Sequence, residues 1–373
     1  MIKSTLTIII AATLLFPLTG SFASAQSKNE TQIVYTDASE FPVFGKAFEE
    51  SPADTIRYQR LPQSFKTISR APLWNLGLNS AGIFIRFRSD SPQICARWES
   101  LFKNAMNHMT DTGIRGLDLY TLVEGKWLFV RSGLPSREKV TTRQIIGNME
   151  PGMREYMLYL SLYDGVQSLE IGVEKGYKLE APAVSSPSTE KPVVMYGTSI
   201  LQGGCASRPG MAFTNIIGRR LDKVVINLGF SGNGLLDYEI AELMAGVSDP
   251  GVFVLDYVPN ANVQQINERG EKFVRIIRDK HPDVPILFLE DPIFPFSNYD
   301  KKILTEITKK NDAQRALFKK LKDSGEKKIY FMSSEDEIGH DLDATVDGIH
   351  FTDLGMERYT DYILPTLKKL LRK

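Results

Sequence analysis

Ser199 is the first residue in this sequence whose setting suggests covalent chemistry. It follows the apolar run Val193–Tyr196 in the tripeptide Gly197-Thr198-Ser199. A serine directly after a buried strand has its hydroxyl held rigidly at a turn, and it becomes an effective nucleophile when a base removes its proton. Such tripeptides are common in ordinary turns, so the segment gains meaning only from a partner base.

Asp347 and His350 can supply that base. On a tight loop their spacing lets the carboxylate reach Nδ1 of the imidazole, which leaves Nε2 to accept the serine proton. A loop that only caps the last helix is one alternative. A metal site is another, although its spacing matches no defined ligand motif. That site would use His340, Asp341, Asp343, Asp347 and His350.

Two further segments can donate hydrogen bonds to a developing oxyanion. Gly232 lies in the glycine-rich run Gly229–Gly234, where the missing side chains let backbone N–H groups approach a ligand; a plain turn is the alternative. Asn260 ends the segment Asp256–Asn260, and its side-chain amide can point at an oxyanion. Its alternative role is to cap the helix that begins near Val263.

The other three histidines are weaker candidates for the base. His108 lies in the N-terminal half, where we prefer a loop role to a substrate contact. His281 stands at a predicted helix end before a proline, and His340 stands in a polar loop. His350 therefore remains the candidate.

The segments that must position these residues alternate between strand and helix from Lys191 onward. Apolar strand patterns occupy residues 193–196, 224–228, 252–255, 286–289 and 329–331. Helical patterns occupy residues 211–221, 235–245, 263–280, 301–323 and 353–371. The alternation predicts an α/β domain with a parallel sheet covered on both faces. Ligands of such sheets bind beyond the C-terminal strand ends, where the candidate segments lie.

The N-terminal half has a different hydrophobic pattern. Short runs rich in aromatic and branched residues, separated by turn residues, predict an antiparallel β-sandwich. They occupy residues 83–88, 117–120, 126–130, 156–160 and 169–173. All three tryptophans, Trp74, Trp98 and Trp127, lie in this half. We favour core packing for at least two of them, and a stacking platform for sugar rings is the alternative.

The chain of 373 residues is expected to form two domains. Residues 26–180 form the predicted sandwich, residues 181–190 a linker rich in proline and serine, and residues 191–373 the α/β domain. Hydrophobic residues make up 42% and charged residues 24% of the chain, which excludes a disordered or collagen-like protein.

Residues 1–25 have the features of a secretory signal peptide. A single charge, Lys3, precedes the apolar run Leu6–Leu18, and an Ala-x-Ala pattern predicts cleavage after Ala25. The run is short for a membrane anchor. We therefore expect an exported protein, periplasmic or extracellular, with no membrane insertion once the signal is removed.

The charge balance and the cysteine content argue against several other classes of protein. Removing Lys3 from the 45 basic residues leaves 44 against 45 acidic ones, and this balance disfavours nucleic acid as a partner. Cys95 and Cys205 are too few for a disulfide scaffold or a four-thiolate zinc site, so we expect two buried free thiols. The sequence carries no signal for an oligomeric state.

The order of these motifs resembles the SGNH, or GDSL-type, hydrolase superfamily. The resemblance covers residues 191–373 and rests on Gly197-Thr198-Ser199, Gly232, Asn260 and Asp347-x-x-His350. The first block differs from the family's Gly-Asp-Ser, and Asp-Tyr-Val-Pro-Asn replaces Gly-x-Asn-Asp. The loop 202–211 and the extra β domain resemble secreted bacterial members with two domains, which are often carbohydrate esterases.

The resemblance implies a role for each residue. Ser199 would be the nucleophile, His350 its base and Asp347 the acid that orients His350. The N–H groups of Ser199 and Gly232 and the amide of Asn260 would form the oxyanion hole. The implied fold is a three-layer α/β/α, flavodoxin-like domain after a jelly-roll-like sandwich.

The implied function is a secreted serine esterase that removes acetyl or other short acyl groups from carbohydrate esters, with no cofactor and no metal. A lipase or thioesterase and a non-catalytic carbohydrate-binding protein are the alternatives. Arg208 either binds a substrate hydroxyl or carboxylate or forms a salt bridge that fixes its loop. Cys205 is expected to be a small buried residue rather than a second nucleophile.

Overall fold

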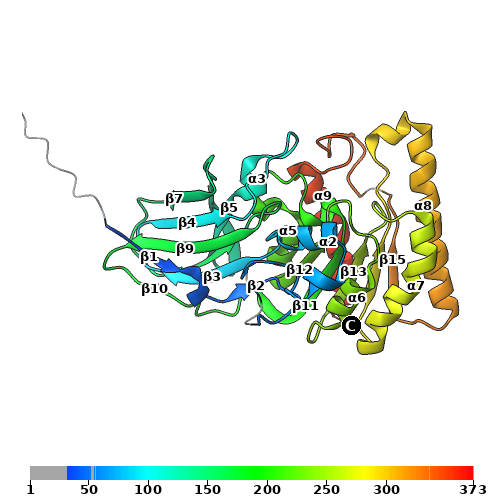
Figure 1. Ribbon diagram of the computed structural model, residues 1–373, viewed down its shortest axis with the longest axis horizontal. Coiled ribbons are helices and arrows are strands. Elements are labelled where there is room, and N and C mark those ends of the chain that lie inside the picture. Colours follow the sequence, from blue (N-terminus) through cyan, green and yellow to red (C-terminus); the bar gives the residue numbers. More distant parts are fainter. Residues whose placement is uncertain (1–31, 52–53, 55, 336, 373) are drawn as a thin grey trace, which may run out of the picture. The chain divides into compact units, whose positions relative to one another are not determined.

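The computed structural model describes residues 32–51, 54, 56–335 and 337–372. The predicted signal peptide, residues 1–25, lies outside the described residues. Residues Ile33–Lys373 form one compact unit, with antiparallel sheets in its N-terminal half and a parallel sheet with helices in its C-terminal half (Figure 1). The predicted fold class is confirmed.

Two antiparallel sheets form the N-terminal sandwich. One has the strand order β1-β9-β4-β7, and the other has the order β10-β3-β8-β5-β6 with β2 beside β3. The strands are β1 (Ile33–Asp37), β2 (Val43–Phe44), β3 (Phe84–Ser89), β4 (Ile94–Ser100), β5 (Leu117–Val123), β6 (Lys126–Gly133), β7 (Val140–Ile146), β8 (Arg154–Tyr159), β9 (Val166–Glu174) and β10 (Leu179–Glu180). Apolar side chains from both sheets form one core between them.

Strand β8 of the second sheet is buried on both faces. Side chains alternate between the faces of a strand, and along β8 Leu158 belongs to the sandwich core. Its neighbours Met157 and Tyr159 belong to a second cluster that also contains Tyr196 and Ile226 of the C-terminal half. The two halves of the chain therefore share a hydrophobic cluster.

The parallel sheet has the strand order β12-β11-β13-β14-β15. Its strands are β11 (Ser188–Gly197), β12 (Lys223–Gly229), β13 (Val252–Asp256), β14 (Ile286–Leu289) and β15 (Ile329–Met332). This is the doubly wound, flavodoxin-like order, whose ligand crevice lies where the strand order reverses, between β11 and β13. β11 begins at Ser188, inside the segment that the sequence predicts as a linker.

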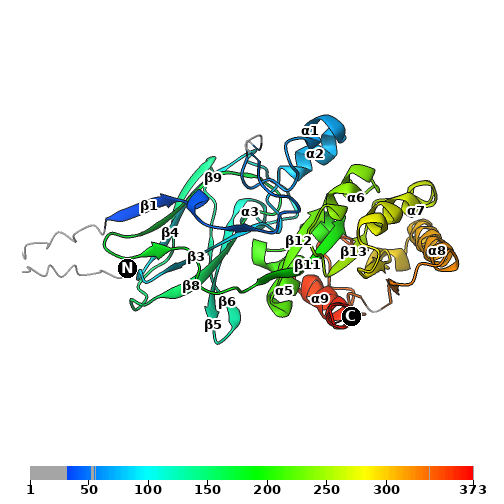
Figure 2. The same ribbon diagram turned by 90° about the horizontal axis from the view of Figure 1, so that it is seen from below.

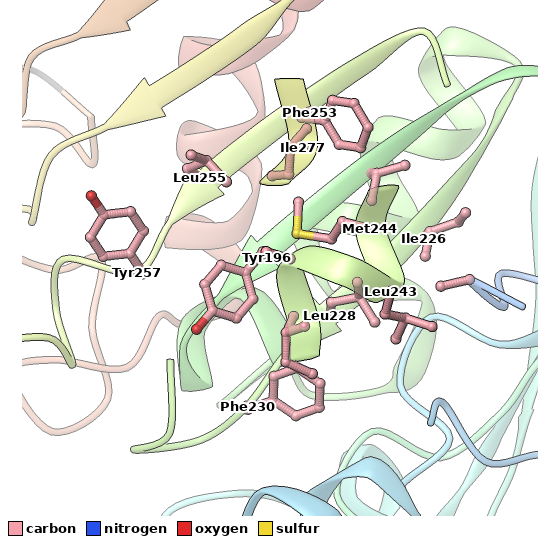
Figure 3. Packing of buried hydrophobic residues seen from close by; sticks show 14 of the residues in the cluster. Tyr196, Ile226, Leu228, Phe230, Leu243, Met244, Phe253, Leu255, Tyr257 and Ile277 are labelled. Atoms are coloured by element: carbon pink, nitrogen blue, oxygen red, sulfur yellow. The ribbon is translucent and has the colours of Figure 1, made fainter. Parts of the chain in front are cut away.

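Helices cover both faces of the parallel sheet. α6 (Tyr238–Ala245), α7 (Val263–Lys280) and α8 (Lys301–Asp323) pack on one face, and α5 (Phe213–Leu221) and α9 (Asp353–Leu370) on the other (Figure 2). Along β11, Val194 and Tyr196 face the first layer, whereas Val193 and Met195 face the second. Figure 3 shows part of the first layer from close by. Burial on both faces explains the unbroken apolar runs of these strands.

The burial of the tryptophan and cysteine side chains tests several smaller predictions. Trp74, Trp98 and Trp127 are 8%, 1% and 6% exposed, so all three are core residues and none offers a stacking platform. Cys95 and Cys205 are buried free thiols, as expected. Within the described ranges, no helix combines the length and the apolar character needed to cross a bilayer.

Candidate active site

Ser199 stands where β11 ends and the short helix α4 (Ser199–Gln202) begins. The N-terminal half holds this turn. The Tyr163 hydroxyl donates to the Ser199 carbonyl at 3.0 Å, and Gln202 Nε2 donates to the Leu162 carbonyl at 3.1 Å. Ser199 is 7% exposed, and it lines a cleft.

His350 lies beside Ser199. Its Nε2 is 2.9 Å from Ser199 Oγ, and its Nδ1 is 2.8 Å from Asp347 Oδ2. Asp347 Oδ1 accepts hydrogen bonds from the N–H groups of Ile349 and His350 at 3.0 and 2.8 Å. Burial alone would raise the pKa of Asp347, but these hydrogen bonds lower it to about 2. The carboxylate therefore stays charged, and Nε2 is placed to take the proton of Ser199.

Gly232 and Asn260 border the same space. Gly232 has a φ of +66°, a region that favours glycine, and no atom lies within 4 Å of where a Cβ would stand. Asn260 Oδ1 accepts a hydrogen bond from the Gly234 N–H at 3.2 Å. That bond defines which end of the amide is oxygen and leaves Nδ2 as the end that can donate.

Neighbouring residues fill the two helix-capping roles considered above. Asn262, rather than Asn260, caps α7 by accepting from the Gln265 N–H at 2.8 Å. Thr352, rather than Asp347, caps α9 by accepting from the Gly355 N–H at 3.3 Å. Neither Asn260 nor Asp347 therefore caps a helix. Asn260 borders the cleft, and Asp347 binds His350.

A cleft of about 430 Å³ surrounds these groups. Ser199, Gly232, Asn260 and His350 line one part of it. Much of the remaining lining is apolar and comes from Ile200, Phe294, Phe296, Ile303, Ile307 and Ile349. Asp291 also lines the cleft and forms an ion pair with Lys310. Burial raises the pKa of Asp291 to about 6, although Lys310 opposes the shift.

Arg208 is not among the residues that line this cleft. Its Nη1 donates to Asp118 Oδ2 at 2.8 Å and to the Tyr120 hydroxyl at 2.7 Å, and its guanidinium carbon lies 3.7 Å from the centre of the Phe129 ring. Asp118 also accepts from the Gly210 N–H at 2.7 Å. Of the two roles predicted for Arg208, these contacts support the salt bridge, because the guanidinium is engaged with a buried carboxylate.

The run Gly116–Tyr120 explains how that carboxylate reaches Arg208. Leu117 and Leu119 belong to the sandwich core, so the alternation along β5 turns Asp118 and Tyr120 to the opposite face. The sequence analysis treated this run as a plain strand. A carboxylate inside an otherwise apolar strand was the signal that could have drawn attention to it.

Arg60 is a second residue that the sequence analysis missed. It is 1% exposed and donates to the carbonyls of Asn79, Leu76 and Gly229 at 2.9, 2.7 and 2.5 Å. Burial lowers the pKa of Arg60 to about 9. Because Gly229 opens the run that contains Gly232, Arg60 connects the N-terminal half to the loop Gly229–Gly234. Its partner is 169 positions away, so no local pattern reveals it.

His108 and Cys205 lie close to the Ser199–His350 pair. The centroids of the His108 and His350 rings are 5.4 Å apart, a proximity that its predicted loop role did not anticipate. Cys205 is 6% exposed, and burial raises the pKa of its thiol to about 12, with a further contribution from Asp347. The thiol is therefore protonated at neutral pH, as expected for a residue that is not a second nucleophile.

The alternative metal site around His340 and Asp343 is not supported. Asp341 is bound by Arg358 at 2.6 and 2.7 Å, and Asp347 is bound by His350. Within the part of the chain that the structure describes, these five side chains do not gather into a common ligand set.

Two family descriptions match the chain. The GDSL-like Lipase/Acylhydrolase family matches residues 190–368. A family described as the N-terminus of Esterase_SGNH_hydro-type proteins, and called GxDLY, matches residues 33–179; the run Gly116–Tyr120 reads Gly-Leu-Asp-Leu-Tyr. No protein of curated function matches the sequence.

Solved structures resemble the chain over most of its length. A protein from Bacteroides ovatus described as a GDSL-like lipase is 34% identical, with a TM-score of 0.86 over 91% of this chain and 98% of that one. The salicylyl-acyltransferase SsfX3 from a tetracycline biosynthetic pathway is 17% identical, with a TM-score of 0.74 over 91% and 97%. A family two carbohydrate esterase from Clostridium thermocellum, solved with cellohexaose, is 13% identical, with a TM-score of 0.56 over 89% and 99%.

Proposed function

Because the chain belongs to the GDSL-like lipase/acylhydrolase family and is an ester-bond hydrolase, we propose that it removes acetyl or other short acyl groups from carbohydrate esters through an acyl-enzyme on Ser199. The observation that carries this proposal is the chain of hydrogen bonds from Asp347 through His350 to Ser199 at the edge of the cleft.

The reaction starts with attack of Ser199 Oγ on the ester carbonyl. His350 Nε2, 2.9 Å away, accepts the serine proton, and the Asp347 carboxylate stabilises the imidazolium that forms. The imidazolium then gives the proton to the leaving alcohol oxygen as the C–O bond breaks. A water molecule next gives a proton to His350 and attacks the acyl carbon. As the bond between the acyl carbon and Ser199 Oγ breaks, the imidazolium returns this proton to Oγ, which releases the acid and restores Ser199.

The oxyanion is stabilised by donors from three loops. These are the N–H groups of Ser199 and Gly232 and the Nδ2 group of Asn260, all of which border the cleft. Fixed donors of this kind act where negative charge develops, and they need no reorganisation during the reaction. The hydrogen bond from Gly234 to Asn260 Oδ1 keeps the amide in the orientation that this role requires.

The size of the cleft supports a short acyl group. A volume of about 430 Å³ is near the lower end of the range of ~300–1,000 Å³ for ligand pockets, and it must hold the acyl group and part of the alcohol. The carbohydrate portion of the proposal is supported by the fold shared with an esterase that was solved with cellohexaose.

Export is part of the proposal. Residues 1–25 carry the signal-peptide pattern, and acylated polysaccharides are substrates met outside the cytoplasm. Cell fractionation and mass spectrometry of the N-terminus test it: we expect a periplasmic or extracellular protein that starts at Gln26. A protein recovered in the cytoplasm with Met1 still present would contradict export.

Ester hydrolysis by the mature protein tests the reaction. We expect rapid turnover of 4-nitrophenyl acetate, loss of that turnover in Ser199→Ala with unchanged circular dichroism, and retention of most activity in Ser231→Ala. Ser231 is the matched control because it also lines the cleft but, among the described residues, has no hydrogen bond to His350. Equal rates in Ser199→Ala and wild type would rule out Ser199 as the nucleophile. Acetate release from acetylated polysaccharides then tests the natural substrate.

A lipase or thioesterase remains the second candidate because the cleft contains the aromatic pair Phe294 and Phe296 and several isoleucines. Chain-length preference separates the two. A maximum of kcat/KM at acetyl or propionyl esters supports the carbohydrate esterase, whereas a maximum at octanoyl or longer esters supports the lipase.

A further inference from the structure

Three side chains that can bind a metal ion meet beside Ser199. His108 comes from the loop before α3 (Asp111–Arg115), Cys205 from the loop after α4, and His350 from the loop before α9. One ligand atom of each lies within 4.8 Å of the other two. Among the described residues, no other set of three histidine, cysteine or acidic side chains meets so closely. The proposed reaction uses only His350.

We propose that His108, Cys205 and His350 form a binding site for Zn²⁺ or a similar soft divalent cation, and that the bound cation inhibits the enzyme by taking His350 away from Ser199. The site shares only His350 with the carboxylate-rich alternative around His340, and the same residue is the one that it shares with the catalytic group.

The three side chains have the chemistry that Zn²⁺ prefers. Two imidazoles and one thiolate are typical zinc ligands, and a water molecule can complete a four-coordinate site. Zinc–ligand bonds of about 2.0–2.3 Å place tetrahedral ligand atoms roughly 3.3–3.8 Å apart. The three ligand atoms, which lie within 4.8 Å of one another, therefore need to approach by no more than about 1.5 Å.

Zinc binding and the hydrogen bond to Ser199 exclude each other. His350 Nδ1 is held by Asp347 at 2.8 Å, and a carboxylate in this position commonly orients a zinc-binding histidine. Only Nε2 of His350 is then left for the cation. The same nitrogen lies 2.9 Å from Ser199 Oγ, and its single lone pair cannot serve both.

The cation can reach the site from solvent. His108 and His350 are half-buried, whereas Cys205 is buried. When the cation binds, the S–H bond of Cys205 breaks, its proton leaves to solvent, and the thiolate sulfur bonds to the metal. No oxidant or reductant takes part.

Titration with Co²⁺ tests the site directly, since Co²⁺ replaces Zn²⁺ and absorbs in the near ultraviolet when a thiolate binds it. We expect one Co²⁺ per mature chain with a thiolate band, no such band in Cys205→Ala, and affinity at least about tenfold weaker in His108→Asn. His340→Asn is the matched control for loss of a histidine and should bind like wild type. A wild-type spectrum without the band, or a band that persists in Cys205→Ala, would overturn the site.

Ester hydrolysis tests the inhibition. Zn²⁺ should inhibit the wild type reversibly on addition of a chelator, and Mg²⁺ should not, because it prefers oxygen ligands. Cys205→Ala and His108→Asn should keep their basal activity and require at least about tenfold more Zn²⁺ for half inhibition. Equal sensitivity of both variants and the wild type would show that zinc acts elsewhere.

The inhibition rests on the proposed role of His350, whereas the binding does not. Ser199→Ala should bind Co²⁺ at least as tightly as wild type, because it removes the competing hydroxyl. A thiolate band together with unaffected ester hydrolysis would contradict His350 as the base while the metal site stands. Absence of the band together with Ser199-dependent hydrolysis would reject the metal site while the esterase stands.

Discussion

Asn260 and Asn262 lie two residues apart and have different tasks. Asn260 borders the cleft, and Asn262 caps α7. We expect Asn260→Ala to lower kcat by on the order of 10²–10³, because an oxyanion donor acts mainly in the transition state. Steady-state kinetics with 4-nitrophenyl acetate measure kcat, and thermal unfolding measures the stability of the variant.

The neighbouring variant Asn262→Ala provides the control. It should lower the free energy of unfolding by about 1 kcal/mol through loss of the cap and leave kcat nearly unchanged. If Asn260→Ala were as active as Asn262→Ala, the oxyanion role of Asn260 would be wrong.

Asp291 should make stability depend on pH in an unusual direction. Burial raises its pKa to about 6 in the folded protein, above the ordinary value of about 3.9. A carboxyl group with a raised pKa favours folding when it is protonated, so its contribution is fully present below about pH 4 and is lost as the pH rises toward about 6. This loss amounts to roughly 2–3 kcal/mol.

Urea unfolding of wild type and Asp291→Asn between pH 4 and 7 measures this contribution. Across that interval the free energy of unfolding of the wild type should fall by roughly 2–3 kcal/mol more than that of Asp291→Asn. Parallel pH profiles of the two proteins would show that Asp291 does not titrate in this range.

The types and spacing of residues predicted part of the site. Ser199 stood out because it follows an apolar strand, and Asp347 and His350 because they share one loop. The contact of Arg208 with Asp118 and that of His108 with His350 could not be predicted, because these partners are distant in sequence and leave no local pattern. The helix caps were ambiguous for a related reason, since neighbouring residues of similar type compete for one role.

At the scale of single elements, β5 is the strand that connects the sandwich to the loop after the nucleophile. Arg208→Ala leaves the carboxylate of Asp118 buried without its cation. We expect a loss of about 3 kcal/mol in the free energy of unfolding, near the lower end for a broken buried pair, because 21% of the Arg208 side chain is exposed. KM for small esters should stay the same, because Arg208 does not line the cleft.

Arg220→Ala is the matched control. Arg220 pairs with Glu357 and Asp361 on the surface, and exposed pairs contribute about 0–1 kcal/mol. A raised KM with unchanged stability in Arg208→Ala would instead support a substrate contact.

The elements were predicted best where the apolar pattern was strong. α7 and α8 have the predicted limits, and β14 does as well, because each is bounded by clear polar or turn residues. β7 was missed because it exposes most of its side chains, so its sequence lacks a regular alternation. The short helix α2 (Ala71–Gly77) was missed because its seven residues are too few for a helical period to emerge.

At the scale of the whole molecule, the hydrolase half depends on the sandwich. Arg60 holds the carbonyl of Gly229, and Tyr163 holds the carbonyl of Ser199. We expect a fragment of residues 188–373 to be misfolded or at least on the order of 10²-fold less active, because a displacement of about 1 Å can cost that much. Circular dichroism and ester kinetics of the fragment check this.

A milder variant tests the same dependence in the intact chain. Tyr163→Phe removes the hydroxyl that donates to the Ser199 carbonyl and also contacts Ser231, so we expect a lower kcat, little change in KM and an unchanged circular dichroism spectrum. Wild-type kcat in both the fragment and Tyr163→Phe would show that the sandwich does not position the catalytic groups.

The distance along the chain between Ser199 and His350 also sets when activity can arise during synthesis. The strands of the sandwich are complete once β10 has been made, and the nucleophile follows soon after. Its base lies 151 residues further on. A ribosome that stops between the two residues, or a protease that removes the segment with His350, therefore yields a product with a serine but no base, and newly made enzyme is inactive toward the esters of its own cell until that segment has been made.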